Sequence, residues 1–307
     1  MTSKPFINRL ILLLGLISIP SFGQQDAQYT QYMYNTMSIN AAYAGQREVL
    51  SIVGLHRSQW VGIDGAPQTQ TLGIHSPLRN ERIGIGLSII NDQLGPARET
   101  YASGSFSYSI LLNSYDTKLS LGINAGFHLL KTDWSKGKYQ NPDIAFNENL
   151  NLFSPIIGAG LYLHSRKWYA GISVPNLITT KHYSDFQESL ATESLHFFLI
   201  GGYVLDLTEN TKFKPSFLIK AVFGSPVIAD LSANFLLYDK LTLGVAWRWD
   251  DSISALAGFQ VTKNLYIGYA YDLTTTGLKN YNSGSHEIML RFELLQKNKR
   301  LLSPRFF

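Results

Sequence analysis

Few side chains in this sequence have the type and spacing that catalysis or metal binding requires. The seven histidines include no H-x-x-x-H or H-E-x-x-H pair, the spacing that brings two ring nitrogens onto one ion. His164-Ser165 offers a base and a nucleophile, but no carboxylate stands near it in the sequence to orient the ring. Gly84-x-Gly86 lacks the third glycine of a dinucleotide loop, and Asp250-Asp251 suits a solvated turn. We therefore expect no enzyme, no cofactor and no metal.

The first 23 residues have the layout of a cleaved secretory signal. Lys4 and Arg9 give a positive start, and an apolar stretch follows over residues 10–19. Pro20 ends that stretch, and Ser21-Phe22-Gly23 places small residues where a signal peptidase requires them. An uncleaved anchor is the alternative, although the stretch is short for a spanning helix. No later apolar run approaches the roughly 20 residues of such a helix, so the exported chain either is soluble or crosses a membrane as strands.

Composition narrows the class further. The chain has no cysteine, which excludes a lipid-anchored N-terminal cysteine, disulfides and thiolate metal sites. Charged residues make up 16%, against roughly 25% in ordinary soluble domains, as expected for a surface largely covered by lipid. The net charge of +4 falls by two when Lys4 and Arg9 are removed with the signal. No long Lys/Arg block is present, so we expect no nucleic-acid partner.

Alternation of large apolar with small or polar residues runs through most of the mature chain. In residues 241–249, Leu243 and Trp247 fall on one face of a strand, and Thr242 and Arg248 on the other. This pattern over about 250 residues, behind an export signal, is typical of a barrel with lipid outside and a polar lumen inside. We predict an all-β fold: a transmembrane antiparallel β-barrel of about 14 strands, with 12 to 16 possible. The predicted strands are 49–59, 68–77, 82–92, 99–112, 117–130, 153–164, 167–175, 195–206, 211–223, 227–238, 241–250, 252–262, 264–273 and 284–294.

Connection lengths predict the orientation. Links at one end are short, such as 79–81 and 239–240, whereas several at the other end are long: 131–152, 176–194 and 274–283. Outer-membrane barrels have short periplasmic turns and longer outer loops, so both termini should face the periplasm.

The chain thus divides into a signal peptide (1–23), an N-terminal periplasmic segment (24–47), the outer-membrane barrel (48–294) and a basic C-terminal tail (295–307). A disordered or plugging extension is the alternative for both terminal segments. Mixed charges on neighbouring strands can pair across the lumen and fill it, whereas a selective pore gathers one sign in a constriction. The inward residues therefore favour a plugged scaffold over a porin; they are Lys214, Lys220, Asp230, Asn234, Arg248, Asp272, Glu287, Arg291 and Glu293.

Six blocks of sequence carry a family resemblance. They are residues 28–45, 57–69 (RSQWVGIDGAPQT), 84–87 with 91–96 (GIGL and NDQLGP), 169–177 (YAGISVPNL), 268–272 (GYAYD) and 284–288 (GSHEI). Together they span the mature chain, which resembles the PorP/SprF family of Bacteroidetes. Thr36 and Ala41 depart from the family pattern, which often has proline at these points.

This resemblance implies an outer-membrane component of the type IX secretion system. Such a protein would assist export and/or surface anchoring of a secreted protein with a C-terminal sorting domain, such as a gliding adhesin. The implied partners are that secreted protein, other type IX secretion components and outer-membrane lipid. Two other classes stay open: an outer-membrane porin for small solutes, and a lipid-active enzyme that would use His164 or Ser165.

Residues 57–67 form the most distinctive block and are the predicted partner-binding site. We expect the block to span the end of the first strand and the first outer loop, where Asp64-Gly65 makes the turn and Pro67 stiffens its exit. The alternative is a role in folding the barrel rim, with Arg57 and Trp60 anchoring the membrane interface. The predicted partner-binding residues are Arg57, Gln59, Trp60, Asp64, Gly65, Ala66 and Pro67.

Overall fold

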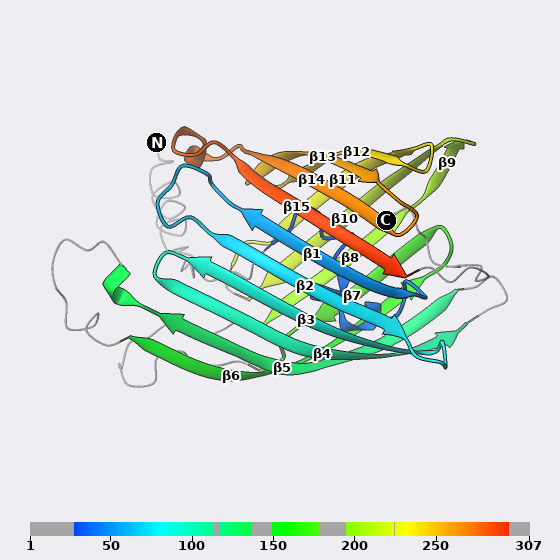
Figure 1. Cartoon of the computed structure of the whole chain (residues 1–307), viewed down its shortest axis with the longest axis horizontal. Coiled ribbons are helices and arrows are strands. Elements are labelled where there is room, and N and C mark those ends of the chain that lie inside the picture. Colours follow the sequence, from blue (N-terminus) through cyan, green and yellow to red (C-terminus); the bar gives the residue numbers. More distant parts are fainter. Residues whose placement is uncertain (1–27, 113–116, 137–148, 179–194, 224, 295–307) are drawn as a thin grey trace, which may run out of the picture.

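The computed structural model describes residues 28–112, 117–136, 149–178, 195–223 and 225–294. Within these ranges the chain forms one antiparallel sheet that closes on itself as a barrel (Figure 1). The predicted signal peptide and the predicted basic tail lie outside the described residues.

Strand pairing closes the barrel between the first and last strands. β1 (Leu50–Ser58) pairs with β15 (Ser285–Leu294), and β10 (Thr211–Val222) pairs with β11 (Ile228–Leu237), so the sheet becomes a ring. β8 (His196–Tyr203) and β9 (Leu205–Thr208) both pair with β10 and act as one strand interrupted at a single residue. The barrel therefore has 14 strands, which confirms the predicted fold and its even strand number.

The remaining strands overlap the predicted ones closely. β3 and β4 are longer at their shared end than predicted, because they meet in a tight turn at Gly95-Pro96, where Gly95 takes a φ of 55°. The remaining strands are β2 (Gln68–Pro77), β3 (Ile83–Leu94), β4 (Ala97–Leu111), β5 (Lys118–Thr132), β6 (Leu150–His164), β7 (Trp168–Val174), β12 (Leu241–Arg248), β13 (Ser252–Gln260) and β14 (Leu265–Thr274).

Side chains alternate between the two surfaces of the barrel as the sequence predicts. In β12, Val245 and Trp247 point outward and are 59% and 44% exposed, while Thr242 and Arg248 are buried in the lumen. An apolar outer surface suits contact with lipid, and a polar lining has to find its partners inside the barrel.

The two ends of the barrel differ in their connections. We call the end with the long connections the loop end and the other the turn end. Loop-end connections are 59–67, 95–96, 133–149, 175–195, 223–227, 249–251 and 275–284; turn-end connections are 78–82, 112–117, 165–167, 209–210, 238–240 and 261–264. That the turn end and both termini face the periplasm stays a prediction.

Helical structure is limited to single 3₁₀ turns in the described ranges. These are η1 (Thr36–Ser38) and η2 (Ala41–Tyr43) before the barrel, and η3 (Trp134–Lys136) and η5 (Gly277–Asn280) at the loop end. Among the described residues, no helix has the length and apolarity to cross a membrane.

Residues 28–49, here called the plug segment, lie inside the barrel. From Tyr29 to Val49 every residue is buried except Ser38, which is half-buried. We expected a periplasmic segment at 24–47, with a plug as the alternative; its described residues lie in the lumen, as in that alternative. The physical reason is width, because side chains alone fill a barrel of about eight strands but not a larger one.

Candidate functional site

The plug segment packs as the core of the barrel. Tyr32, Tyr34 and Tyr43 join lumen-facing side chains such as Tyr162 and Met289 in one buried cluster. Burial raises the pKa of Tyr32 and Tyr34 well above the usual value, so both phenols stay neutral. An aromatic segment of this kind fills a wide lumen with few residues.

Local turns fold the plug segment before it meets the wall. Its first turn is closed by hydrogen bonds from the Tyr34 N–H to the Gln31 carbonyl and from the Asn35 N–H to the Tyr32 carbonyl, at 3.0 and 3.1 Å. Asn40 then caps η2, because its side-chain oxygen accepts from the Ala42 N–H at 3.0 Å. These local hydrogen bonds hold the short, non-periodic segment in turns. Its other backbone and side-chain polar groups are left to bond with the barrel wall.

A buried charge cluster, here called the latch, ties the start of the plug segment to β1, β14 and β15. Arg57 Nη1 lies 2.7 Å from Asp272 Oδ2 and 3.1 Å from Glu287 Oε2, and all three side chains are at most 3% exposed. The backbone N–H groups of Thr30 and Gln31 donate to the two Glu287 oxygens at 3.0 and 2.8 Å. The Thr30 hydroxyl donates to Asp272. Every partner of this network is desolvated, so its members depend on one another.

Further ion pairs hold the end of the plug segment. Arg47 contacts Glu293 of β15 at 2.6 Å through both Nε and Nη2. Lys118 of β5 reaches Glu48 at 2.7 Å. The chain is thus fixed where it leaves the lumen to begin β1.

Neutral hydrogen bonds hold the middle of the plug segment on β4, β6 and β7. The Ser107 hydroxyl donates to the Ala44 carbonyl and the Ser173 hydroxyl to the Ile39 carbonyl, both at 2.7 Å. The Asn40 amide donates to the Leu161 carbonyl at 3.0 Å.

Strand glycines on this side of the lumen leave room for the plug backbone. A Cβ on Gly122 would lie 2.1 Å from the Ala42 nitrogen, and one on Gly84 would lie 2.1 Å from the Ala44 carbonyl oxygen. Both neighbours are backbone atoms, so no side-chain movement could relieve the contact. The glycines of β3 and β5 therefore mark where the plug touches the wall.

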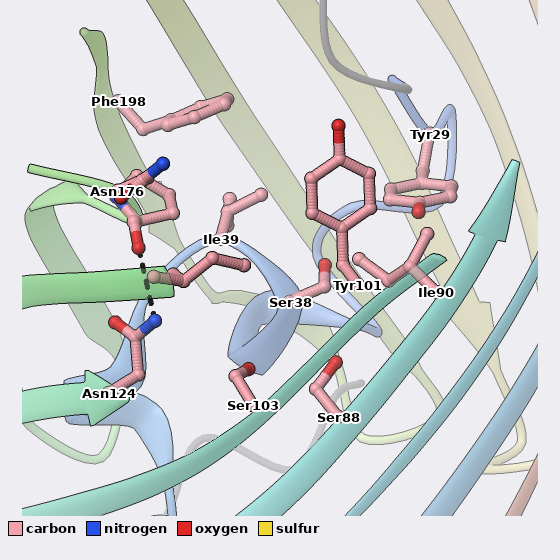
Figure 2. Close-up of a pocket in the computed structure, with 12 residues that line it drawn as sticks. Tyr29, Ser38, Ile39, Ser88, Ile90, Tyr101, Ser103, Asn124, Asn176 and Phe198 are labelled. Atoms are coloured by element: carbon pink, nitrogen blue, oxygen red, sulfur yellow. Dashed lines mark hydrogen bonds between the residues drawn. The ribbon is translucent and has the colours of Figure 1, made fainter. Parts of the chain in front are cut away.

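A cavity of about 90 Å³ lies where the plug faces the loop-end half of the lumen. Figure 2 shows Ser38 and Ile39 of the plug segment facing Tyr101, Ser88 and Asn124 of the wall. The Asn124 amide donates to the Pro175 carbonyl at 3.0 Å across one side of the cavity. Hydroxyl and amide groups beside aromatic rings suit a small neutral molecule or water.

The predicted block 57–67 separates into two parts. Arg57 is 2% exposed and points into the lumen, where it forms the latch. Gln59 to Pro67 form a loop at the barrel rim, in which Asp64 and Gly65 are exposed and Pro67 is buried. Arg57 therefore faces no external partner in this state, which corrects its place in the predicted surface.

The rim loop is braced from both sides. The Val61 N–H donates to the Gly284 carbonyl and the Ser283 N–H to the Val61 carbonyl, at 2.9 and 2.8 Å, so the loop continues the sheet toward the 275–284 connection. On its other side the Gly95 N–H donates to the Gly65 carbonyl at 2.9 Å. Trp60 takes a φ of 45°, an uncommon value for a large residue, and its backbone N–H donates to the Ser285 hydroxyl. Two neighbouring connections and the start of β15 thus fix the shape of this loop.

The sequence predicted the lumen charges but not their partners. Asp272 and Glu287 were predicted to face inward, and the structure pairs them with Arg57 and the plug backbone. Arg57 was read as a rim residue because it lies next to the loop, although in the alternation of β1 it shares the buried, lumen-facing side with Val53 and Leu55. The strand glycines are a feature of the sequence that could have indicated a plug, because in the structure they face the stretch 41–45, which is rich in small residues.

Histidines in the lumen serve the plug. His164 Nε2 lies 3.0 Å from the Gln46 side-chain oxygen, and the Gly45 N–H donates to His75 Nδ1 at 3.1 Å. In the parts of the chain that the structure describes, no three His, Asp or Glu side chains gather as a metal site would require.

The closed sheet and its outward apolar face define a class of protein, an outer-membrane β-barrel, here with its own N-terminal segment in the lumen. A family model described as type IX secretion system membrane protein PorP/SprF matches residues 21–292. The chain belongs to this PorP/SprF family, and is thus a multi-pass outer-membrane component of the type IX secretion system.

Solved structures add a likeness in fold. The CymD monoaromatic hydrocarbon channel aligns at a TM-score of 0.50 and 10% identity, covering 85% of this chain and 93% of that one. The outer membrane protein Omp33 of Acinetobacter baumannii aligns at 0.47 and 9% identity, covering 81% of this chain and 100% of that one. The likeness to CymD shows the barrel fold alone. None of the curated proteins compared with the chain matches it.

Proposed function

We propose that this protein assists the export and/or surface anchoring of a secreted protein with a C-terminal sorting domain, such as a gliding adhesin, and that it catalyses no reaction. The structural observation behind the proposal is that the chain's own plug segment occupies the lumen. A barrel filled in this way has its free surfaces at the two ends and on the lipid face, so recognition of a large partner falls to the rim.

The rim loop 59–67 is the proposed contact surface. Its shape is fixed by hydrogen bonds to two neighbouring connections, and Val61, Asp64 and Gly65 stay exposed. A surface that is already ordered loses little conformational entropy when a partner binds. We therefore assign recognition to the exposed part of the predicted block, and not to Arg57.

Two alternatives meet obstacles in the lumen. A porin for small solutes would need an open path, whereas the plug segment is buried against the wall along its length. A lipid-active enzyme would need His164 within reach of lipid, but this ring is 2% exposed and faces Gln46 inside the barrel. Both arguments support a role in binding.

The test is complementation of a deletion strain with the full chain, followed by mass spectrometry of the surface proteome. The variant Val61→Asp with Asp64→Lys changes the exposed rim and leaves the lumen intact. The matched control, Lys263→Glu, changes charge at the turn end. We expect the rim variant to lose one or more surface proteins with a C-terminal sorting domain, and the control to retain them.

Affinity purification of the same variants from detergent-solubilised outer membrane sharpens the result. The wild-type chain and the control should recover the secreted partner, and the rim variant should not. An unchanged surface proteome in the deletion strain, or steady single-channel conductance of the wild-type chain in planar bilayers, would overturn the proposal, the latter in favour of the porin.

A further inference from the structure

Two buried arginines share one carboxylate in the turn-end half of the lumen. Glu293 Oε1 lies 2.6 Å from Arg47 Nη2 but 3.8 Å from Arg291 Nε. The side chains of Arg47 and Arg291 are 4% and 6% exposed. Arg47 therefore takes the short contact, and Arg291 keeps only a distant one among the residues that the structure describes.

Arg291 is held by aromatic rings. Its guanidinium carbon lies 4.8 Å from the centre of the Tyr266 ring and 5.6 Å from that of Tyr34. A cation–π contact holds a guanidinium through its charge and uses no oxygen acceptor, so its N–H groups can donate elsewhere. A fixed, buried cation with donors to spare is the usual element of a carboxylate or phosphate site.

A cavity of about 390 Å³ opens beside Arg291 at the turn end. Tyr266, Thr242 and Gln260 line it within the barrel, and Val204 and Leu236 give it apolar sides. The mouth of this cavity, at the turn end, carries Arg166, Lys167, Lys212 and Lys240, with Asp206 and Asp239.

Both aspartates at the mouth of the cavity already pair with lysines. Asp206 lies 2.8 Å from Lys167, and Asp239 lies 2.8 Å from Lys212. The lining thus carries more cationic than acidic side chains, and burying a charge is costly unless an opposite charge compensates it.

We propose that this turn-end cavity binds an oxyanion from the aqueous phase, a phosphate or a carboxylate group. Arg291 binds the anion inside the cavity, and Lys240 at the mouth of the cavity attracts it. The oxyanion supplies the negative charge that Glu293 alone does not. Neither residue belongs to the rim loop 59–67, so this site is independent of the proposed partner-binding role.

Titration calorimetry on the full chain in a non-ionic detergent tests the site. The probes are inorganic phosphate and acetate, which separate the two oxyanion chemistries, and chloride is the reference. We expect saturable binding of phosphate, acetate or both, and none of chloride. Arg291→Met should weaken binding at least about tenfold, the scale of one charge-assisted hydrogen bond. Lys240→Glu should weaken it by a smaller factor.

The control variant is Lys263→Met, a turn-end lysine outside the cavity lining, which should bind as the wild type does. Folding of each variant is checked by its heat-dependent gel mobility. Absence of saturable binding to both oxyanions overturns the proposal. So does unchanged affinity in Arg291→Met or, should that variant fail to fold, in Lys240→Glu.

Discussion

The two walls of the lumen hold the plug segment by different physics. On one wall, formed by β1, β14 and β15, buried charges of Arg57, Asp272 and Glu287 grip the start of the segment. On the facing wall, formed by β3 to β7, glycines admit the plug backbone and neutral hydroxyls bind its carbonyls, and the Lys118–Glu48 ion pair lies only at the end of the segment, where it leaves the lumen. The charged wall specifies position by ion pairing, and the glycine wall specifies it by shape.

This difference determines how each wall tolerates change. A buried ion pair fails when one partner is removed, but it can be replaced as a whole by neutral groups at little cost. A backbone contact at van der Waals distance has no neutral replacement, because any added carbon must displace the plug. The charged wall is therefore the one that could change without rebuilding the barrel.

The largest effect is expected on the charged wall. Arg57→Met leaves Asp272 and Glu287 buried without their cation, which should lower the free energy of unfolding by about 3–5 kcal/mol. Urea unfolding in detergent micelles measures the loss. The triple variant Arg57→Met, Asp272→Asn, Glu287→Gln removes the charges together and should recover most of it. A triple variant no more stable than the single one would show that the wall depends on the charges themselves.

A substitution on the glycine wall should cause a smaller loss in the free energy of unfolding, and neutralising charges elsewhere should not restore it. Gly122→Val brings a side chain onto the Ala42 backbone, at a cost of about 1–3 kcal/mol. Gly104→Val in β4 is the matched control, because a Cβ there would meet atoms no nearer than 4.0 Å. The same unfolding measurement applies. Equal losses in the two variants would mean that the plug does not press on β5.

A single neutral hydrogen bond of the glycine wall is worth less. Ser107→Ala removes the donor to the Ala44 carbonyl and should lower the free energy of unfolding by about 1 kcal/mol. Ser105→Ala, two residues earlier on the same face of β4, is the control and should change it less. If Ser105→Ala lowered the free energy of unfolding more than Ser107→Ala does, the Ser107 hydroxyl would not be what holds the plug on this wall.

Salt should have the smallest effect. The latch is at most 3% exposed, and buried pairs are screened far less than surface ones. Raising NaCl to about 0.5 M should therefore shift the wild-type unfolding midpoint less than Ser107→Ala does. A larger shift would mean that water and ions reach the latch.

The strands could be predicted from the sequence because their signal is local. Alternation in β12, for example, depends only on neighbouring residues and on which solvent each face meets, and the structure confirms it. The barrel was predicted from this alternation, because it runs through most of the mature chain behind an export signal. The inward charges Asp272, Glu287 and Arg291 followed from the same alternation.

The plug and the latch were not predictable in the same way. Thr30 and Glu287 are 257 residues from one another in sequence at their contact, and no periodicity links a turn-rich segment to the strand opposite it. The position of Arg57 was misjudged for this reason: its neighbours in sequence belong to the rim loop, but its partners in space belong to β14 and β15.

The sequence by itself predicted an exported chain that forms a membrane barrel of about 14 strands with a charged lumen, since the signal layout, the composition and a period of two residues are local features; the structure gives the count as 14. Only the tertiary structure decided what occupies that lumen, which wall binds it by charge and which by shape, and that Arg57 faces inward. A closed barrel brings distant strands to a common interior, and contacts across that interior depend on closure, which no local pattern records.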